Sequence, residues 1–161
     1  MQDIKTDLPT HLEAKTALDS ALSAFADSAP INEQDIKTAS LGISNSIQIR
    51  DYALGGIPLV LTDYQDITRF MNLLEGIGGA SAGASAIFGA FTYEAGYTQE
   101  AHTYLDKSLE LQNGYSLALL LRRVFSAGWS PASFASMRNE LHSKVVEGLK
   151  DLEEVLVNAS R

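Results

Sequence analysis

Cysteine is absent from this chain of 161 residues, and proline occurs only four times. Without thiols the chain can form no disulfide bond, iron–sulfur cluster or thiolate zinc site, and it has no cysteine nucleophile. No apolar run approaches the roughly 20 residues that cross a bilayer. The polar N-terminal stretch lacks the apolar centre of a signal peptide. We therefore predict a cytoplasmic protein with no membrane segment.

Basic residues are scarce: the sequence has 12 Lys and Arg against 20 Asp and Glu, and its formal net charge is −8. Binding to nucleic-acid phosphates requires clustered positive charge. The only adjacent basic pair, Arg122-Arg123, lies in an apolar stretch, so we predict no nucleic-acid partner. The acidic residues are scattered rather than gathered in dense rows. An acidic inhibitor of a DNA-binding enzyme is therefore a minor alternative.

Apolar residues make up 45% of the chain, which is enough for a sizeable core in one domain. In several segments they recur at the three- and four-residue steps of a helix. These segments are Leu8–Asp27, Asn32–Ile43, Ile47–Leu54, Thr62–Ile77, Ala82–Ala95, Thr98–Leu111, Tyr115–Ala127 and Ser130–Val157. We predict an all-α, compact bundle of about seven or eight helices. It should form a single domain over residues 1–161, with 1–7 as a flexible N-terminus.

Helix start signals lie at the beginning of several of these segments. Asn32 and Thr98 are suitable N-caps, and Thr62 followed by Gln65 matches a capping box. Ser130-Pro131 combines an N-cap with proline at the first helical position, which is a specific start signal.

Two further patterns concern the end of one helix and the place of another. The helix that begins at Ile47 should end at Gly55-Gly56. Ile57–Leu61 has the composition of a short strand, but no partner strand is evident, so we favour an extended connector or a distorted helical turn. Farther on, Leu117–Val124 is apolar around most of its circumference, which is typical of a central helix.

The stretch Gly79–Gly83 spells G-x-S-x-G, the pattern around the nucleophile of many serine hydrolases. Such a serine follows a strand and needs an acid and a histidine, and Asp106 and His142 occur in the required order. The preceding segment has the pattern of an amphipathic helix, so we interpret the stretch as a glycine C-cap followed by an N-cap at Ser81. A P-loop interpretation fails because the phosphate-binding lysine is missing.

The three histidines, His11, His102 and His142, are far apart in the sequence. None has a second histidine four residues away, and none lies in an H-E-x-x-H pattern, so a shared metal site would need long-range convergence. We predict no metal, no cofactor and no catalytic residue, and hence a protein that is not an enzyme.

The segment Ala82–Asn113 resembles one helical hairpin of the tetratricopeptide type. In that motif two small residues let the helices approach closely, and Gly89 and Ala101 have the expected spacing. The match departs from the motif at Ser108, where alanine is usual. The expected core positions are Phe88, Leu105 and Leu109. One hairpin is too few for a solenoid, which needs about three stacked repeats.

A longer stretch, Glu100–Pro131, resembles an uncharacterised actinobacterial family, the domain of unknown function numbered forty-one ninety-two. The pattern is a helix with small and leucine positions, a glycine turn followed by Tyr115, a leucine-rich helix, and a glycine before proline. Upstream, Ile49–Asp51 and Leu54 resemble the family's Arg-Asp segment, so the resemblance covers residues 12–135. It implies a helical fold, a position in the C-terminal part of longer members, and an origin in an actinobacterium or a phage. It implies no activity and no site.

A small set of residues is a candidate for protein binding. Arg50 and Asp51 form a charged pair that either contacts a partner or joins two helices, and we favour the second interpretation. The last helix either packs back across the bundle or docks in a partner's groove. The remaining candidates are Phe91, Tyr104, Tyr115, Trp129, Leu152 and Leu156.

Together these features predict a non-catalytic helical module that binds or regulates a protein partner. The expected mechanism is apolar docking on a helical groove with a charged rim. A self-assembling structural component, with a homo-oligomer formed through the last helix, is the main alternative.

Overall fold

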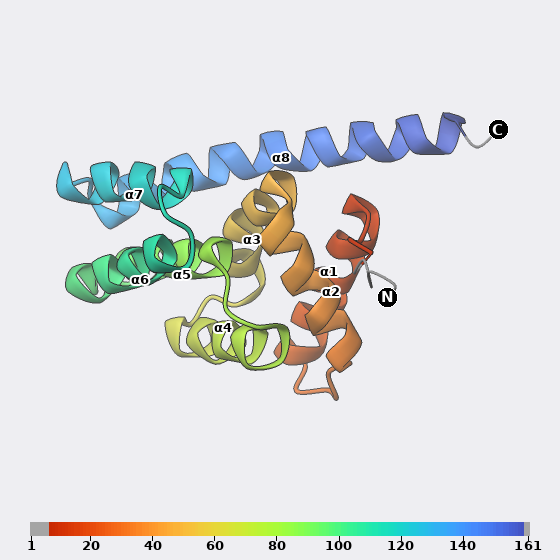
Figure 1. Ribbon diagram of the computed structural model, residues 1–161, viewed down its shortest axis with the longest axis horizontal. Helices are drawn as coiled ribbons and strands as arrows, with labels where there is room; N and C mark the ends of the chain where they lie inside the picture. The colour runs from red at the N-terminus through yellow and green to blue at the C-terminus, as the bar shows by residue number, and fades with distance from the viewer. Residues whose placement is uncertain (1–6, 160–161) are drawn as a thin grey trace, which may run out of the picture.

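The computed structural model describes residues 7–159, and the side chains of residues 7–151. Over residues 7–159 the chain forms eight α-helices and no strand, which confirms the predicted all-α bundle (Figure 1). The helices are α1 (His11–Ala26), α2 (Glu33–Asn45), α3 (Ile47–Val60), α4 (Tyr64–Gly78), α5 (Ala82–Glu94), α6 (Thr98–Leu111), α7 (Ser116–Ser126) and α8 (Pro131–Ala159). None of these described helices combines the length and apolar character needed to cross a membrane.

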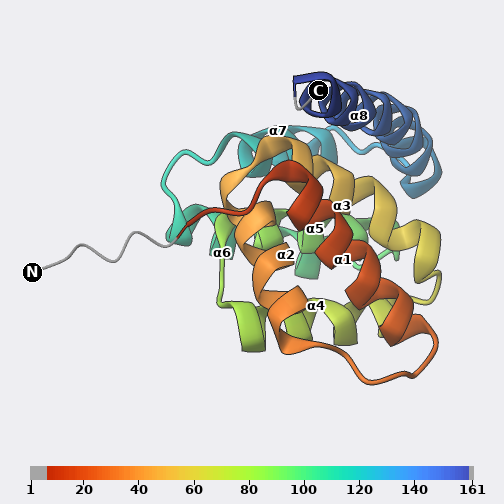
Figure 2. The same cartoon turned by 90° about the vertical axis from the view of Figure 1, so that its right-hand side faces the viewer.

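Helix α5 is the centre of the bundle, and in Figure 2 it lies between α3 above and α4 below. Its sequence, AGASAIFGAFTYE, is small or apolar on all sides, so neighbours can pack around its whole circumference. All its residues except Ala84 and Glu94 are buried, and it contacts α2, α3, α4, α6, α7 and α8. The central position predicted for Leu117–Val124 is wrong, because that segment lies in α7, where Leu119 and Leu120 are exposed.

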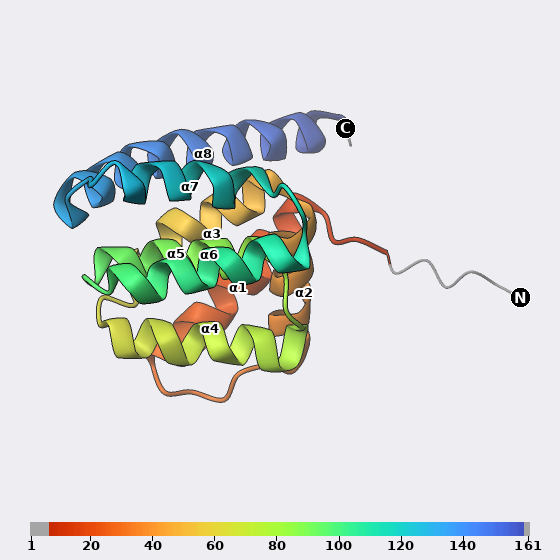
Figure 3. The ribbon, with the colours of Figure 1, turned by 60° about the vertical axis from the view of Figure 1, so that its left-hand side comes forward.

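Helices α5 and α6 form a helical hairpin over the segment predicted to do so, and they lie side by side in Figure 3. A methyl group on Gly89 would lie 3.0 Å from Cδ2 of Leu105 and 3.2 Å from the carbonyl oxygen of Ala101. Glycine therefore allows the close approach of the two helices. The Ser108 hydroxyl donates a hydrogen bond to the carbonyl oxygen of Ala82 at 2.7 Å. The departure from alanine at this position thus adds a bond between the two helices.

Helices α1 and α2 form a second pair, connected by residues 27–32. The Thr10 hydroxyl accepts a hydrogen bond from the amide of Glu13 at 3.1 Å, so α1 begins later than predicted. Asn32 caps α2 as predicted, accepting from the amide of Gln34 at 2.8 Å. Between the two helices, Ser28 has a φ of +56°, in the left-handed region that few non-glycine residues adopt.

Helix α3 is longer than predicted. It continues through Gly55 and Gly56, includes Pro58, and ends at Val60. Proline has no N–H to donate to the preceding turn, so the local sequence disfavours this extension. The turn is nevertheless helical because Ile57 is fully buried and α3 packs against α8.

Two predicted N-caps are displaced by one residue. Asp63, rather than Thr62, caps α4, and its carboxylate accepts a hydrogen bond from the amide of Gln65 at 2.7 Å. Thr98 is the first residue of α6, and the N-cap residue Tyr97 makes no capping bond through its side chain. Both corrections concern the ends of helices that were correctly predicted.

The long helix α8 runs across one side of the bundle, over α3, α5 and α1 (Figure 1). It begins where predicted, with Ser130 as the capping residue. Phe134 and Leu149 are buried, so this part of α8 packs back across the bundle. Leu152 and Leu156 lie outside the described side chains.

Candidate functional site

The interpretation of Gly79–Ser81 as a turn is confirmed. Gly79 follows α4 with a φ of +89°, and Ser81 Oγ accepts a hydrogen bond from the amide of Ala84 at 3.1 Å. A helix precedes this serine, whereas the nucleophile of a serine hydrolase follows a strand. Asp106 is ion-paired with a residue of α7, and the ring of His142 packs on α3. Ser81 thus serves as the N-cap of α5.

The predicted pair Arg50–Asp51 lies between α3 and the start of α7. Arg50 is 8% exposed, and its Nη2 lies 2.9 Å from the Asp51 carboxylate. Its Nη1 donates a hydrogen bond to the Tyr115 hydroxyl at 3.2 Å. Burial alone would lower the pKa of the Arg50 guanidinium, but its bond to Tyr115 and the charge of Asp51 raise that pKa above its ordinary value. The structure brings these three predicted residues together as a partly buried link between α3 and the start of α7.

The other predicted aromatic residues differ in exposure. Phe91 is 2% exposed and belongs to the core, so it offers little free surface to a partner. Tyr104 is half-buried and stacks on Phe88 with ring centres 4.2 Å apart, and burial raises the pKa of its hydroxyl. Trp129 is 40% exposed and is the most accessible of the predicted aromatic residues.

Sequence reasoning missed the corner where α3 meets α4. Leu59 and Val60 end α3, and they are 60% and 46% exposed. Leu61 follows, is 4% exposed, and lines two separate cavities. We call residues Leu59–Leu61 the α3–α4 corner, and the two cavities the α1–α4 cavity and the α4–α5 cavity.

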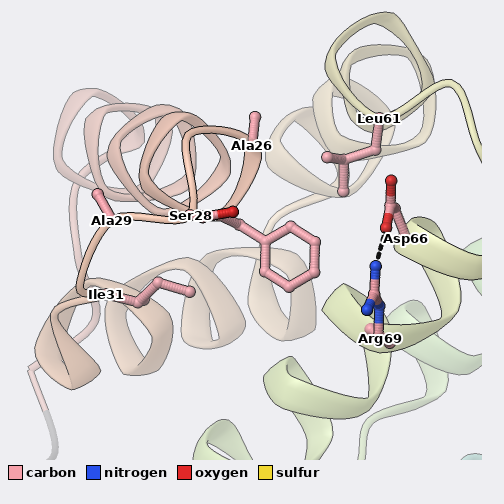
Figure 4. A pocket seen from close by; sticks show the side chains of 8 residues that line it. Ala26, Ser28, Ala29, Ile31, Leu61, Asp66 and Arg69 are labelled. Atoms are coloured by element: carbon pink, nitrogen blue, oxygen red, sulfur yellow. Dashed lines mark hydrogen bonds and ion pairs between the residues drawn. The ribbon is translucent and has the colours of Figure 1, made fainter.

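The α1–α4 cavity has a volume of about 350 Å³ (Figure 4). Its lining combines apolar side chains with one ion pair and comprises Phe25, Ala26, Ser28, Ala29, Ile31, Leu61, Asp66 and Arg69. Figure 4 shows the Asp66–Arg69 pair on α4, across the cavity from the end of α1. The Phe25 ring contacts the buried Phe70 ring edge-on, with centres 5.5 Å apart, which fixes part of the apolar wall.

The α4–α5 cavity has a volume of about 340 Å³ and lies among α3, α4, α5 and α8. Its lining is mostly apolar and comprises Pro58, Leu61, Thr62, Tyr64, Ile67, Phe91, Glu94, Ala95 and Arg138. The Tyr64 hydroxyl is hydrogen-bonded to the Thr92 hydroxyl at 2.8 Å, and its ring lies 5.3 Å from that of Tyr97. These contacts hold Tyr64 in place at the edge of the cavity.

Arg138 and Glu94 form a buried ion pair in this cavity that sequence reasoning also missed. Arg138 Nε and Nη2 donate to the two carboxylate oxygens of Glu94 at 2.8 and 2.9 Å. Arg138 Nη1 also donates to the carbonyl oxygen of Gly55 at 3.4 Å, so the pair ties α8 to α5 and α3. The side chains are 7% and 15% exposed. One sequence signal existed: Arg138 lies four residues after Phe134 on the buried line of α8, where a charge needs a partner.

Among the described residues no three His, Asp or Glu side chains are grouped as a metal site would require. Comparison of the chain with protein families, curated proteins and solved structures finds no match. Function is therefore inferred from the surfaces and cavities of the chain itself.

Proposed function

We propose that this chain is a non-catalytic helical module that binds a protein partner at the α3–α4 corner. The observation that supports it is the coincidence of two exposed aliphatic side chains, Leu59 and Val60, with two cavities that share Leu61. Apolar side chains beside hollows are typical of protein-binding surfaces. A partner can fill the hollows while it covers the exposed side chains.

Covering the corner would contribute hydrophobic free energy to binding. Complete burial of a Leu or Val side chain contributes about 1.5–3 kcal/mol relative to full exposure. The side chains of Leu59 and Val60 are 60% and 46% exposed, so about half of this contribution remains for a partner to supply. Roughly 2 kcal/mol is therefore available from the two together. This is the size at which the loss of an interface residue becomes readily measurable.

Self-association through α8 is the second candidate function. Two exposed apolar side chains on that helix support self-association: Leu141 is 48% exposed and Val146 is 37% exposed. A formal charge of −8 on each copy opposes close association of two chains. A mass that stays monomeric as the concentration rises would contradict self-association and would leave the corner as the binding surface.

Capture of partners from a lysate of the organism that encodes the chain tests the corner. The bait is the full chain, compared with a Leu59→Ser/Val60→Ser variant. A Leu119→Ser/Leu120→Ser variant is the matched control, because it removes two leucines that are 40% and 52% exposed on α7. We expect one stoichiometric partner that the control retains and the corner variant loses, with unchanged helical circular dichroism.

Two results would contradict the proposal. A partner that all three baits retain equally would bind somewhere other than the corner. A folded wild-type bait that captures no partner would oppose protein binding altogether.

A further inference from the structure

We propose that the α1–α4 cavity receives a Lys or Arg side chain of the partner, while an apolar side chain of the same segment enters the α4–α5 cavity. The inference rests on the proposed function, since it names the chemistry of the segment that the corner would bind. Leu61 lines both cavities. The two side chains that enter them must therefore lie close together in the partner.

Two helices end at the α1–α4 cavity. Ala26 is the last residue of α1 and lines the cavity, and α3 ends at Val60, immediately before Leu61. The C-terminal end of a helix carries a partial negative charge, also where loop amides bond its last carbonyl groups, as those of residues 27–29 do at the end of α1. Neither α1 nor α3 has a basic residue in its last turn to offset that charge. Asp66 adds a carboxylate, so the cavity favours a positively charged group.

Arg69 is the one basic residue in the lining of this cavity, and it is ion-paired with Asp66. Its side chain is 69% exposed, and an exposed ion pair of this kind contributes little to stability and exchanges readily. An incoming Lys or Arg can therefore replace Arg69 on Asp66 or share the carboxylate with it. The apolar walls at Phe25 and Ile31 suit the methylene groups of such a side chain.

The α4–α5 cavity has different chemistry. Its two charged residues, Glu94 and Arg138, neutralise each other in a bidentate pair. The wall is otherwise largely apolar at Pro58, Ile67 and Phe91, so an uncharged, apolar side chain fits it best. A second copy of this chain is a poor occupant of the corner because both copies carry a formal charge of −8. A basic, apolar segment of another protein has the complementary charge.

Titration of the isotope-labelled full chain with short peptides tests the inference by NMR. The probes are acetyl-Leu-Arg-Leu-Leu-amide and its counterparts with Gln or Glu in place of Arg. At about 50 mM salt we expect the Arg peptide to bind about fivefold more tightly than the Gln peptide. It should shift amide signals within residues 25–29, Ile31 and residues 61–69. The difference in affinity between the Arg and Gln peptides should shrink at about 500 mM salt. The Glu peptide should bind more weakly than either.

Substitutions of the two members of the Asp66–Arg69 pair should change binding of the Arg peptide in opposite directions. Asp66→Asn should abolish the preference for Arg over Gln, whereas Arg69→Gln should strengthen binding of the Arg peptide about twofold, because it frees Asp66. Glu110→Gln on the exposed side of α6 removes the same charge as Asp66→Asn and should leave the preference intact. A role for the pair in stability alone would instead give Asp66→Asn and Arg69→Gln the same effect on the peptide.

The outcomes separate this inference from the proposed function. Equal binding of the Arg and Gln peptides at residues 25–31 and 61–69 would overturn the cation preference and leave the corner as a binding surface. Shifts confined to other residues, or no shifts with any peptide, would overturn the inference. The lysate capture would then decide on its own whether the chain binds a protein.

Discussion

Gly55 is a point of contact between α3 and α8, and the substitution Gly55→Ala tests whether this contact holds α8 on the bundle. A methyl group on Gly55 would overlap the Cβ, Cγ and Nδ1 atoms of His142. Arg138, one turn before His142, donates a hydrogen bond to the carbonyl oxygen of Gly55 at 3.4 Å. The new methyl group would therefore be placed where α8 is tied to α3.

The free energy of unfolding of Gly55→Ala should be about 2 kcal/mol lower than that of the wild type. Alanine gains about 1 kcal/mol over glycine within a helix. Overpacking a core typically costs about 1–3 kcal/mol. The Cβ of His142 is attached directly to the α8 backbone, so rotation of its side chain cannot remove this overlap. Helix α8 would have to move, which would also weaken the Arg138–Glu94 pair, and complete loss of a buried pair costs about 3–5 kcal/mol.

Urea unfolding monitored by circular dichroism measures the effect. Gly148→Ala is the matched control, because Gly148 lies in α8 with no atom within 4 Å of an added methyl group. That substitution should raise the free energy of unfolding by about 0.5–1 kcal/mol. The two variants make the same chemical change and should move the unfolding midpoint in opposite directions.

A Gly55→Ala variant as stable as the wild type would refute this description of the contact. A double-mutant cycle with His142 makes the test stricter. Gly55→Ala should cost less in a His142→Gly background, where the overlapping Cβ is absent. In a His142→Ala background it should remain costly, because alanine keeps that Cβ.

Three further changes test the buried polar groups. Arg138→Ala should lower the free energy of unfolding by about 3–5 kcal/mol in the urea assay, because it leaves the Glu94 carboxylate buried and unpaired. The double variant Arg138→Met/Glu94→Met should be close to neutral in the same assay, because it removes both charges. The pKa of His142 is lowered by burial and by nearby Arg138, so the unfolded chain binds this proton more readily than the folded one. Stability should therefore fall as the pH drops below about 6.5, and His142→Leu should flatten that fall in unfolding curves recorded across pH. Tyr115→Phe removes the acceptor of a partly buried Arg50 hydrogen bond and should lower the free energy of unfolding by about 1–2 kcal/mol. A thermal midpoint equal to that of the wild type would contradict that role.

The helix starts that were predicted correctly depend on contacts within one turn. The side chains of Asn32, Ser81 and Ser130 each accept a hydrogen bond from an amide two or three residues later. Such bonds depend on nearby residue types, so the sequence predicts them without knowledge of the tertiary structure. The same applies to the hairpin of α5 and α6, whose close approach at Gly89 follows from short-range spacing.

Two errors about the interior came from forces that act between helices. Gly55-Gly56 and Pro58 disfavour a helix locally, yet α3 continues through them because it is packed against α8. The leucines of Leu117–Val124 suggested a central helix, but α5 is central because its small residues admit neighbours on all sides. Side-chain size, rather than hydrophobicity alone, decides which apolar helix is surrounded.

Sequence patterns could not predict the candidate site, because it also depends on contacts between distant parts of the chain. The α1–α4 cavity combines residues 25–31 with residues 61–69, and no local spacing relates these two stretches. The predicted contacts Arg50 and Phe91 were chosen for their chemistry, but the fold buries both side chains. The exposure of Leu59 and Val60 depends on the extension of α3 to Val60, which the sequence did not predict.

The extension of α3 beyond Gly55 creates both the buried junction with α8 and the exposed α3–α4 corner. Near Gly55 the helix lies against His142 and accepts a hydrogen bond from Arg138. At its end, Leu59 and Val60 remain exposed. Natural sequences break local rules where packing or function compensates. Packing against α8 compensates at Gly55, whereas the exposed leucine and valine gain nothing comparable within the described chain. A partner that covers them would supply the missing compensation, and this is the physical argument for the proposal that the corner binds a protein.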